Sequence, residues 1–189
     1  NYFGEQRFGR GFGNLTKGVA LLKGEYKERQ RNKKGMYISA VRSWLFNQFV
    51  SQRIEQGLWS RLLLGDAMMI EGSHSCFVID EIDESIQERF VAQAVHVTAP
   101  MWGHGELLTQ VEAREWENAQ AQCRDEICQL LCNVSLKQER RAIRLLPKGL
   151  HLDVESDNVA WLEFSLPAGA FATSVLRELC NVSVSEQTG

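Results

Sequence analysis

The 189-residue sequence lacks any long uninterrupted apolar run, although 44% of its residues are hydrophobic. A membrane-spanning helix needs about 20 consecutive apolar residues, and the apolar stretches here, such as 62–64, end within a few positions on glycine or charge. Proline is also scarce, at three residues, and the chain is long enough to bury a core. The sequence therefore excludes a membrane span and predicts a globular protein.

Metal-binding patterns are missing as well. The four histidines show no HExxH or HxH spacing, and the five cysteines contain no CxxC pair. Cys128 and Cys132 share a helix face at i, i+4, but Cys123 points away from them. An odd number of cysteines, without a secretory pattern in the first residues, favours reduced, buried thiols over a zinc site or a disulfide framework. We therefore expect no bound metal and a cytoplasmic location.

Positive charge is concentrated in the first third of the chain. Residues 1–61 carry twelve Lys and Arg against four Asp and Glu, whereas residues 62–135 carry three against thirteen. Such a basic segment is typical of binding to a polyanion such as RNA, which the acidic middle would repel. The alternative is that the cations only solvate helix faces, but mutual repulsion lowers stability where five of them fall within eight residues. These five are Lys27, Arg29, Arg31, Lys33 and Lys34.

Hydrophobic spacing and turn residues predict a mixture of helices and strands. The glycine-rich run 8–14 lacks the spacing of a phosphate-binding loop and predicts a flexible turn. Because strands and helices mix without a regular βαβ alternation, the predicted fold class is α+β. The predicted helices are 36–56, a short one capped by Ser85, one or two within 106–131, one that starts at Ser135 and ends before Pro147, and 170–181. The predicted strands are 67–70 and 76–79 around a Gly72-Ser73 turn, 95–98, and a hairpin around Asp157-Asn158.

Four segments of the chain stand out by their residues: NYFGEQRFG at 1–9, KKGMYISAVRSWLFNQFVSQR at 33–53, LGDAMMIEG at 64–72 and FSLPAGAFATSVLREL at 164–179. Together they resemble the TruD family, the tRNA pseudouridine-13 synthases. The resemblance implies a pseudouridine synthase catalytic core, an antiparallel sheet with helices, that carries a mixed α/β TRUD insertion domain. It places residues 1–26 and 151–189 in the core and residues 27–150 in the insertion.

The family reaction isomerises a uridine in tRNA to pseudouridine. The resemblance implies that an aspartate assists cleavage of the glycosidic bond, with no metal or organic cofactor, and that tRNA is the partner. That aspartate belongs to a G-x-K-D type motif that this sequence does not contain, and we do not expect Asp66, Asp80 or Asp83 to replace it. We therefore expect a C-terminal part of an enzyme, inactive by itself, with the aspartate upstream. The oligomeric state stays open, with a monomer favoured.

The opening motif supplies groups that suit this chemistry. Phe3 is the candidate platform for the extruded base, because a base stacks on an aromatic face with about 1–3 kcal/mol; the alternative for Phe3 is ordinary core packing. By resemblance, Asn1 would hold the catalytic carboxylate with its amide, and Arg7 could pair with a phosphate or carboxylate. The candidate RNA-binding residues are Arg29, Lys33, Lys34 and Arg42.

Two other functions remain open at this point. The first is an RNA-binding module that uses the basic first third without chemistry. The second is a protein-interaction domain with an acidic face at residues 80–126, which leaves the opening motif unexplained.

Overall fold

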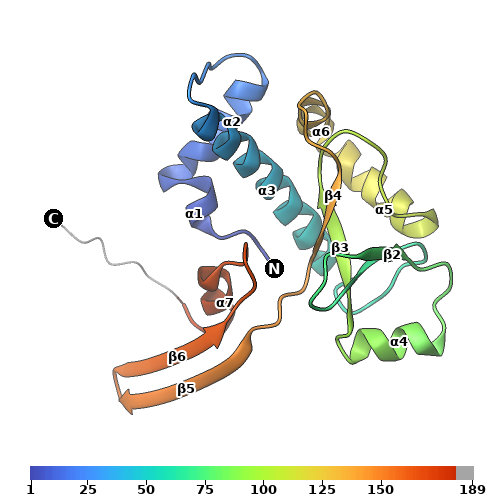
Figure 1. Cartoon of the computed structure of the whole chain (residues 1–189), viewed down its shortest axis with the longest axis vertical. Coiled ribbons are helices and arrows are strands. Elements are labelled where there is room, and N and C mark those ends of the chain that lie inside the picture. The colour runs from blue at the N-terminus through green and yellow to red at the C-terminus, as the bar shows by residue number, and fades with distance from the viewer. Residues whose placement is uncertain (182–189) are drawn as a thin grey trace.

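The structure is a computed structural model that describes residues 1–181, and it combines helices with two antiparallel sheets (Figure 1). This confirms the α+β class. The helices are α1 (Glu5–Phe8), the 3-10 helix η1 (Arg10–Phe12), α2 (Gly13–Leu22), α3 (Arg31–Glu55), α4 (Glu84–Val91), α5 (Val111–Gln122), α6 (Asp125–Cys132) and α7 (Ala172–Leu179). The strands are β1 (Ala67–Ile70), β2 (Cys76–Val78), β3 (Val95–Met101), β4 (Glu139–Ala142), β5 (Lys148–Ser156) and β6 (Val159–Ser165).

Helix α3 runs through the middle of the fold, between α1 and α2 on one side and the larger sheet on the other (Figure 1). Leu45, Phe46 and Phe49 have no exposed surface. Gly18 of α2 lets the two helices approach closely, because a Cβ there would lie 2.4 Å from the carbonyl oxygen of Tyr37. The predicted helix over 36–56 is thus confirmed, and it begins five residues earlier than predicted.

The larger sheet has the strand order β2-β1-β3-β4. Strand β3 lies inside it, and six of its seven residues are buried, the last of them Pro100. The predicted hairpin is confirmed: β1 and β2 pair antiparallel, with Met68 opposite Phe77. Because β3 also packs on α3, this sheet and α3 share one hydrophobic core.

Three local predictions were wrong. The predicted helix after Ser135 is instead strand β4, which pairs with β3 and places Ala142 opposite Thr98. Helix α4 is capped by Asp83, whose carboxylate accepts from the backbone N–H of Ile86, and not by Ser85. The glycine-rich run is not a flexible turn but η1 and the start of α2. For β4 a distant strand pairing decides the structure, and for α4 a competing cap does.

The second sheet is the hairpin β5–β6, which projects from the rest of the described chain (Figure 1). It confirms the hairpin predicted around Asp157-Asn158. Leu152 and Trp161 are more than 60% exposed. Helix α7 follows the hairpin and lies beside the N-terminal residues, where the Ser174 hydroxyl donates to the carbonyl oxygen of Tyr2 at 3.1 Å. Within residues 1–181, no helix is both long and apolar enough to cross a membrane.

Candidate functional site

A cleft of about 600 Å³ lies where five segments of the chain meet. Its walls come from Asn1 and Phe3, from the end of β1 with the turn after it, from both ends of β3, from β4 with the linker after it, and from residues 165–170. Three of the sequence segments that were singled out, at 1–9, 64–72 and 164–179, therefore meet at one place. The first and last of them come together because α7 packs against the N-terminal residues, where the Phe171 ring contacts Phe3 and the Thr173 hydroxyl donates to the Gln6 side-chain oxygen at 3.0 Å.

Phe3 lies in the wall of this cleft and is 7% exposed. Its backbone is fixed by Asn47 of α3, whose side-chain oxygen accepts from the Phe3 N–H at 2.9 Å and whose amide donates to the Phe3 carbonyl at 3.0 Å. Its ring contacts Phe46 and Phe171 edge-on, at centroid distances of 5.5 and 5.6 Å. Phe46 and Phe171 therefore close the ring on two sides, and Phe3 contributes to the wall of the cleft.

Asn1 is held by two consecutive residues of β4. Its Oδ1 accepts from Nη2 of Arg141 at 2.6 Å, and its Nδ2 donates to the carbonyl oxygen of Ala142 at 2.8 Å. Arg141 also donates to the carbonyl oxygen of Gly169 at 3.0 Å, and its guanidinium lies 4.3 Å from the centre of the Phe3 ring. Arg141 thus contacts both candidate residues of the opening motif.

Arg7 contacts the same aromatic cluster. Its guanidinium is 5.4 Å from the Phe3 ring centre and 5.5 Å from that of Phe171, and it donates to the Ser39 hydroxyl at 3.3 Å. Burial, and then the charge of Arg7, lower the pKa of Arg141 to about 10, which leaves Arg141 protonated at neutral pH. Two cations therefore flank Phe3.

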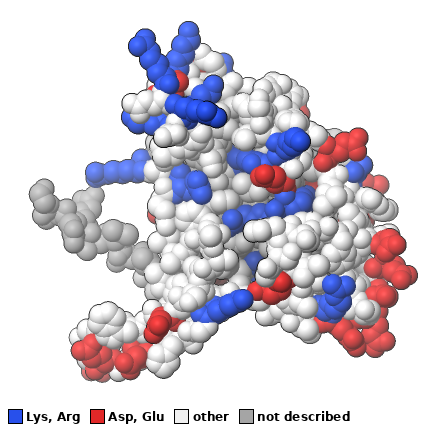
Figure 2. Space-filling view, in the orientation of Figure 1, with Lys and Arg blue, Asp and Glu red and all other residues white. Residues whose placement is uncertain are grey.

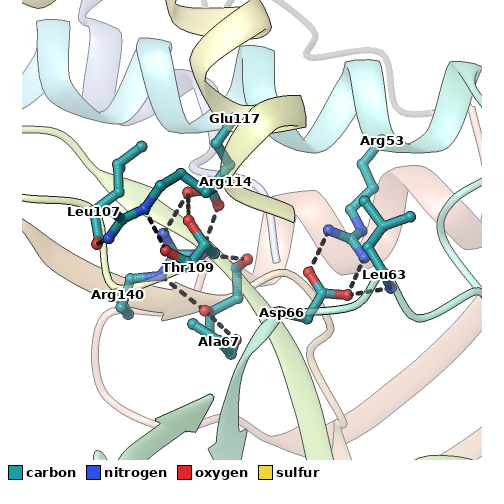
Figure 3. A network of polar contacts seen from close by, with 10 residues as sticks. Arg53, Leu63, Asp66, Ala67, Leu107, Thr109, Arg114, Glu117 and Arg140 are labelled. Carbon is teal, nitrogen blue, oxygen red and sulfur yellow. Dashed lines mark hydrogen bonds and ion pairs between the residues drawn. The ribbon is translucent and has the colours of Figure 1, made fainter. Parts of the chain in front are cut away.

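Two buried ion pairs fix the sheet that carries this cleft (Figure 3). Arg140 of β4 binds Glu117 of α5 through two parallel bonds, with Nη1 and Nη2 at 3.0 and 2.7 Å from its carboxylate oxygens. Arg53 of α3 binds Asp66 in the same way at 2.9 and 2.6 Å. Successive side chains on a strand point to opposite faces, so the burial of Arg140 against α5 directs Arg141 toward the cleft.

The carboxylates near the cleft already have cationic or structural partners. Glu71 lies 2.8 Å from Nε2 of His96 and 3.8 Å from Nζ of Lys148, and Glu139 pairs with Arg42 at 2.9 Å. No aspartate lines the cleft among residues 1–181. The lining that the structure describes therefore offers amide, aromatic and cationic groups, but no unengaged carboxylate.

The predicted RNA-binding cations fall into two groups. Arg29, Lys33 and Lys34 are exposed at the start of α3, and none forms an ion pair within 4.0 Å in the described part of the chain. Figure 2 shows basic side chains gathered over the α1–α3 end of this face, whereas acidic ones lie along the opposite edge and at the tip of the β5–β6 hairpin. This separation matches the charge pattern of the sequence.

Arg42 does not belong to that exposed group. It is 8% exposed, and its guanidinium donates to the carbonyl oxygens of Trp102, Met101 and Lys137 and to the carboxylate of Glu139. All of its donor nitrogens are engaged inside the fold. The structure gives Arg42 the role of joining α3 to the β3–β4 end of the sheet, so we do not include it among the proposed RNA contacts.

The comparisons with known proteins decide the family. The sequence matches the family described as tRNA pseudouridine synthase D (TruD) over residues 28–179. The chain belongs to the TruD family. Proteins named tRNA pseudouridine synthase D from Colwellia psychrerythraea and Shewanella oneidensis are 43% and 47% identical to it, over 96% and 95% of this chain. The matches cover 52% and 48% of those relatives, so this TruD chain spans about half of their length.

A solved structure supports the same fold. A crystal structure from Methanosarcina mazei, of a protein named for the TruD family, aligns with a TM-score of 0.68 and 20% sequence identity. The alignment covers 94% of this chain and 60% of that one. At this identity the likeness shows the fold alone.

The sequence analysis missed Arg141, which contacts Asn1, Phe3 and Gly169 in the candidate site. Arg140 and Arg141 fell within a segment predicted to be helical, so their opposite orientations were not foreseen. Residues 139–143, Glu-Arg-Arg-Ala-Ile, offered only a weak signal for a strand. In a strand the two arginines point to opposite faces.

Proposed function

We propose that this chain is part of a tRNA pseudouridine synthase and forms one wall of its active site. The observation that carries the proposal is that Asn1 and Phe3 meet Arg141 and the 165–170 loop at one cleft. In this proposal the cleft receives a uridine extruded from tRNA, and Phe3 contacts its base from the cleft side. The relatives named tRNA pseudouridine synthase D support the same reaction.

The chain's own residues would orient the reacting groups. The Asn1 amide has one N–H engaged by Ala142, and its second N–H remains to donate to a carboxylate. Such a bond would hold one carboxylate oxygen and leave the other free to react. The nucleophilic aspartate is proposed to come from a part of the protein outside this sequence. The cleft lining that the structure describes holds no aspartate, and Asp66 is already bound by Arg53. The chain alone should therefore give no pseudouridine when incubated with unmodified tRNA, and turnover would overturn this assignment.

The role of Phe3 can be tested in the full-length protein with Phe3→Leu, which keeps apolar volume but removes the aromatic face. Loss of stacking on the order of 1–3 kcal/mol should slow single-turnover formation of pseudouridine by about 5- to 150-fold, since 1.4 kcal/mol is a factor of ten. Affinity for tRNA should change little, because most contacts go to the phosphate backbone.

Phe8→Leu is the matched control, because Phe8 belongs to the same motif, is 5% exposed and does not line the cleft. Both variants should lose similar thermal stability, but only Phe3→Leu should slow the chemical step. Equal rates in the two variants, after correction for the folded fraction, would assign Phe3 to core packing.

We further propose that the basic segment, residues 27–34, binds tRNA phosphates. Its cations surround the first turn of α3, which contains no acidic residue and no side-chain cap. Cations at this end of a helix are unfavourable by about 0.3–1 kcal/mol each, and an anion there is favourable, so a bound phosphate would relieve the repulsion.

Replacing Arg29, Lys33 and Lys34 with Gln should weaken binding of this chain to tRNA and reduce the slope of log affinity against log salt by about 2–3. Replacing Arg61, which is also exposed but lies outside the segment, is the control. An unchanged salt slope in the triple variant would remove the basic segment from the binding surface. Retained, salt-dependent binding by a full-length protein that makes no pseudouridine would instead favour the RNA-binding module.

The domain division is likewise a proposal: residues 1–26 and 151–189 in the catalytic core and residues 27–150 in the insertion domain. The second boundary falls inside β5, and the separate β5–β6 sheet favours a division a few residues earlier, before Lys148. A cytoplasmic, monomeric protein remains our proposal from the sequence.

A further inference from the structure

We propose that Arg141 is the positioning residue of this site: it fixes the orientation of the Asn1 amide and the place of the Phe3 ring for the isomerisation. This inference rests on the proposed function, since it concerns the same cleft. Neither the sequence pattern nor the resemblance singled out this residue.

Arg141 determines which way the Asn1 amide is oriented. A guanidinium only donates hydrogen bonds and a backbone carbonyl only accepts them. Nη2 of Arg141 must therefore face the oxygen of Asn1, and the carbonyl of Ala142 must face its nitrogen, as the 2.6 and 2.8 Å distances show. The reversed amide would place donor against donor and acceptor against acceptor. Arg141 and its neighbour on β4 thus determine where the second Asn1 N–H points.

The same guanidinium also reaches three parts of the cleft. Besides Asn1, it covers the Phe3 ring at 4.3 Å and donates to Gly169 in the loop before α7 at 3.0 Å. Its Nε also lies 3.5 Å from the Asn1 carbonyl oxygen. A planar group with five fixed donors can hold these partners at once, which the single ammonium of lysine cannot do.

Arg141 has no carboxylate partner in the part of the chain that the structure describes. Its N–H groups donate to two carbonyl oxygens and an amide oxygen, and its guanidinium lies over an aromatic ring. Burying a cation without a counter-charge lowers the stability of the fold. A role in the site would explain why the chain keeps such a residue. An arginine that served stability alone would resemble Arg140, the preceding residue, which is neutralised by Glu117.

The experiment uses the full-length protein with four variants: Arg141→Gln, Asn1→Ala, the double variant and Arg114→Gln. Arg114 is the matched control, because its guanidinium also donates to two backbone carbonyls, those of Thr109 and Leu107, and it lies outside the cleft. Arg141→Gln should slow single turnover on the order of 10- to 100-fold, as expected for misplaced catalytic groups, with tRNA affinity within about threefold of the wild type. Arg114→Gln should stay within about twofold in both.

The double variant separates positioning from a direct role. If Arg141 acts through Asn1, adding Arg141→Gln to Asn1→Ala should slow the reaction by a much smaller factor than in the wild type. An equal factor in both backgrounds, or an Arg141→Gln rate like that of the control, would overturn the inference. Inactivity of the wild type on tRNA would instead refute the proposed function. The orientation of Asn1 by Arg141 would then be tested by amide proton exchange, which does not need turnover.

That second measurement does not depend on the reaction or on the stability of the Gln variant. In this chain labelled with ¹⁵N, Arg141→Lys keeps the charge but not the fork of donors. The side-chain amide protons of Asn1 should then exchange with water at least about tenfold faster than in the wild type, while the Asn47 amide, which binds the Phe3 backbone, should be unchanged. Unchanged exchange at Asn1 would show that Arg141 does not orient it.

Discussion

Removing the carboxylate of Glu117 should lower the free energy of unfolding by about 3–5 kcal/mol, because it would leave a buried guanidinium without a counter-charge. Glu117 is 1% exposed, and its carboxylate accepts from both terminal nitrogens of Arg140 and from the Thr109 hydroxyl at 2.8 Å. The Arg140 side chain is itself only 6% exposed. Its remaining bonds, to Thr98, are to neutral oxygens and cannot replace the lost charge.

Glu126→Ala provides the matched comparison on the surface. The ion pair between Lys23 and Glu126 is as short, at 2.8 Å, but its side chains are 31% and 67% exposed. Solvent screens such a pair, and its loss should cost about 1 kcal/mol or less. Urea unfolding of this chain, followed by tryptophan fluorescence, would measure both losses on the same scale.

A third variant tests the stated cause of the Glu117 loss. Arg140→Met in the Glu117→Ala background removes the stranded charge and should recover part of the stability, since buried ion pairs can be replaced by apolar groups at little cost. The buried-charge explanation would be refuted by equal losses in Glu117→Ala and Glu126→Ala, or by no recovery in the double variant. Because domains are stable by only about 5–15 kcal/mol, the measurements belong at low temperature.

Two further predictions concern packing. Gly18→Ala should destabilise the chain by about 1–3 kcal/mol, since the new methyl would meet the Tyr37 carbonyl oxygen at 2.4 Å. Gly35→Ala in α3, with open space around it, should instead stabilise the chain by about 0.4–1 kcal/mol. Urea unfolding in which both variants change stability in the same direction would contradict this. Burial raises the pKa of Cys128 to about 12, so at pH 8 this thiol should react with a disulfide reagent far more slowly than exposed Cys123, and comparable rates on the native protein would show that Cys128 is not shielded.

The elements predicted correctly are those that local pattern determines. Apolar residues at spacings of three and four specify α3, and turn residues between alternating strands specify the hairpins β1–β2 and β5–β6. These signals lie within a few residues of one another. The α+β class followed from their order along the chain.

Strand β4 could not be predicted in this way. Ser135 and Gln138 stand at the spacing of a helix cap, but residues 139–142 pair with β3, about forty residues earlier in the chain. The pairing also lets Arg140 reach Glu117. Contacts between residues so far apart in the chain cannot be recognised from local sequence. The helix-cap spacing of Ser135 and Gln138 therefore led the sequence analysis to predict a helix.

Arg42 shows the limit of reading function from charge. Its position off the apolar stripe of α3 predicts exposure, and exposure on a basic segment predicts RNA contact. Helix α3 is covered on more than one side, by α2 and by β3, so a residue outside the stripe is buried too. A buried arginine was then accommodated by three backbone carbonyls and Glu139.

Strand β4 connects the stability of the fold to the candidate site. Arg140 and Arg141 are neighbours on one strand, so their side chains point to opposite faces of the sheet. The ion pair that holds Arg140 against α5 therefore also fixes the direction in which the Arg141 side chain points. A loosened β4 would release Asn1 and weaken the contact between Arg141 and the Phe3 ring. The surviving folded molecules of Glu117→Ala should therefore also react more slowly in the full-length protein, whereas those of Glu126→Ala should not. Normal single-turnover rates in folded Glu117→Ala would show that the site keeps its geometry without the buried pair.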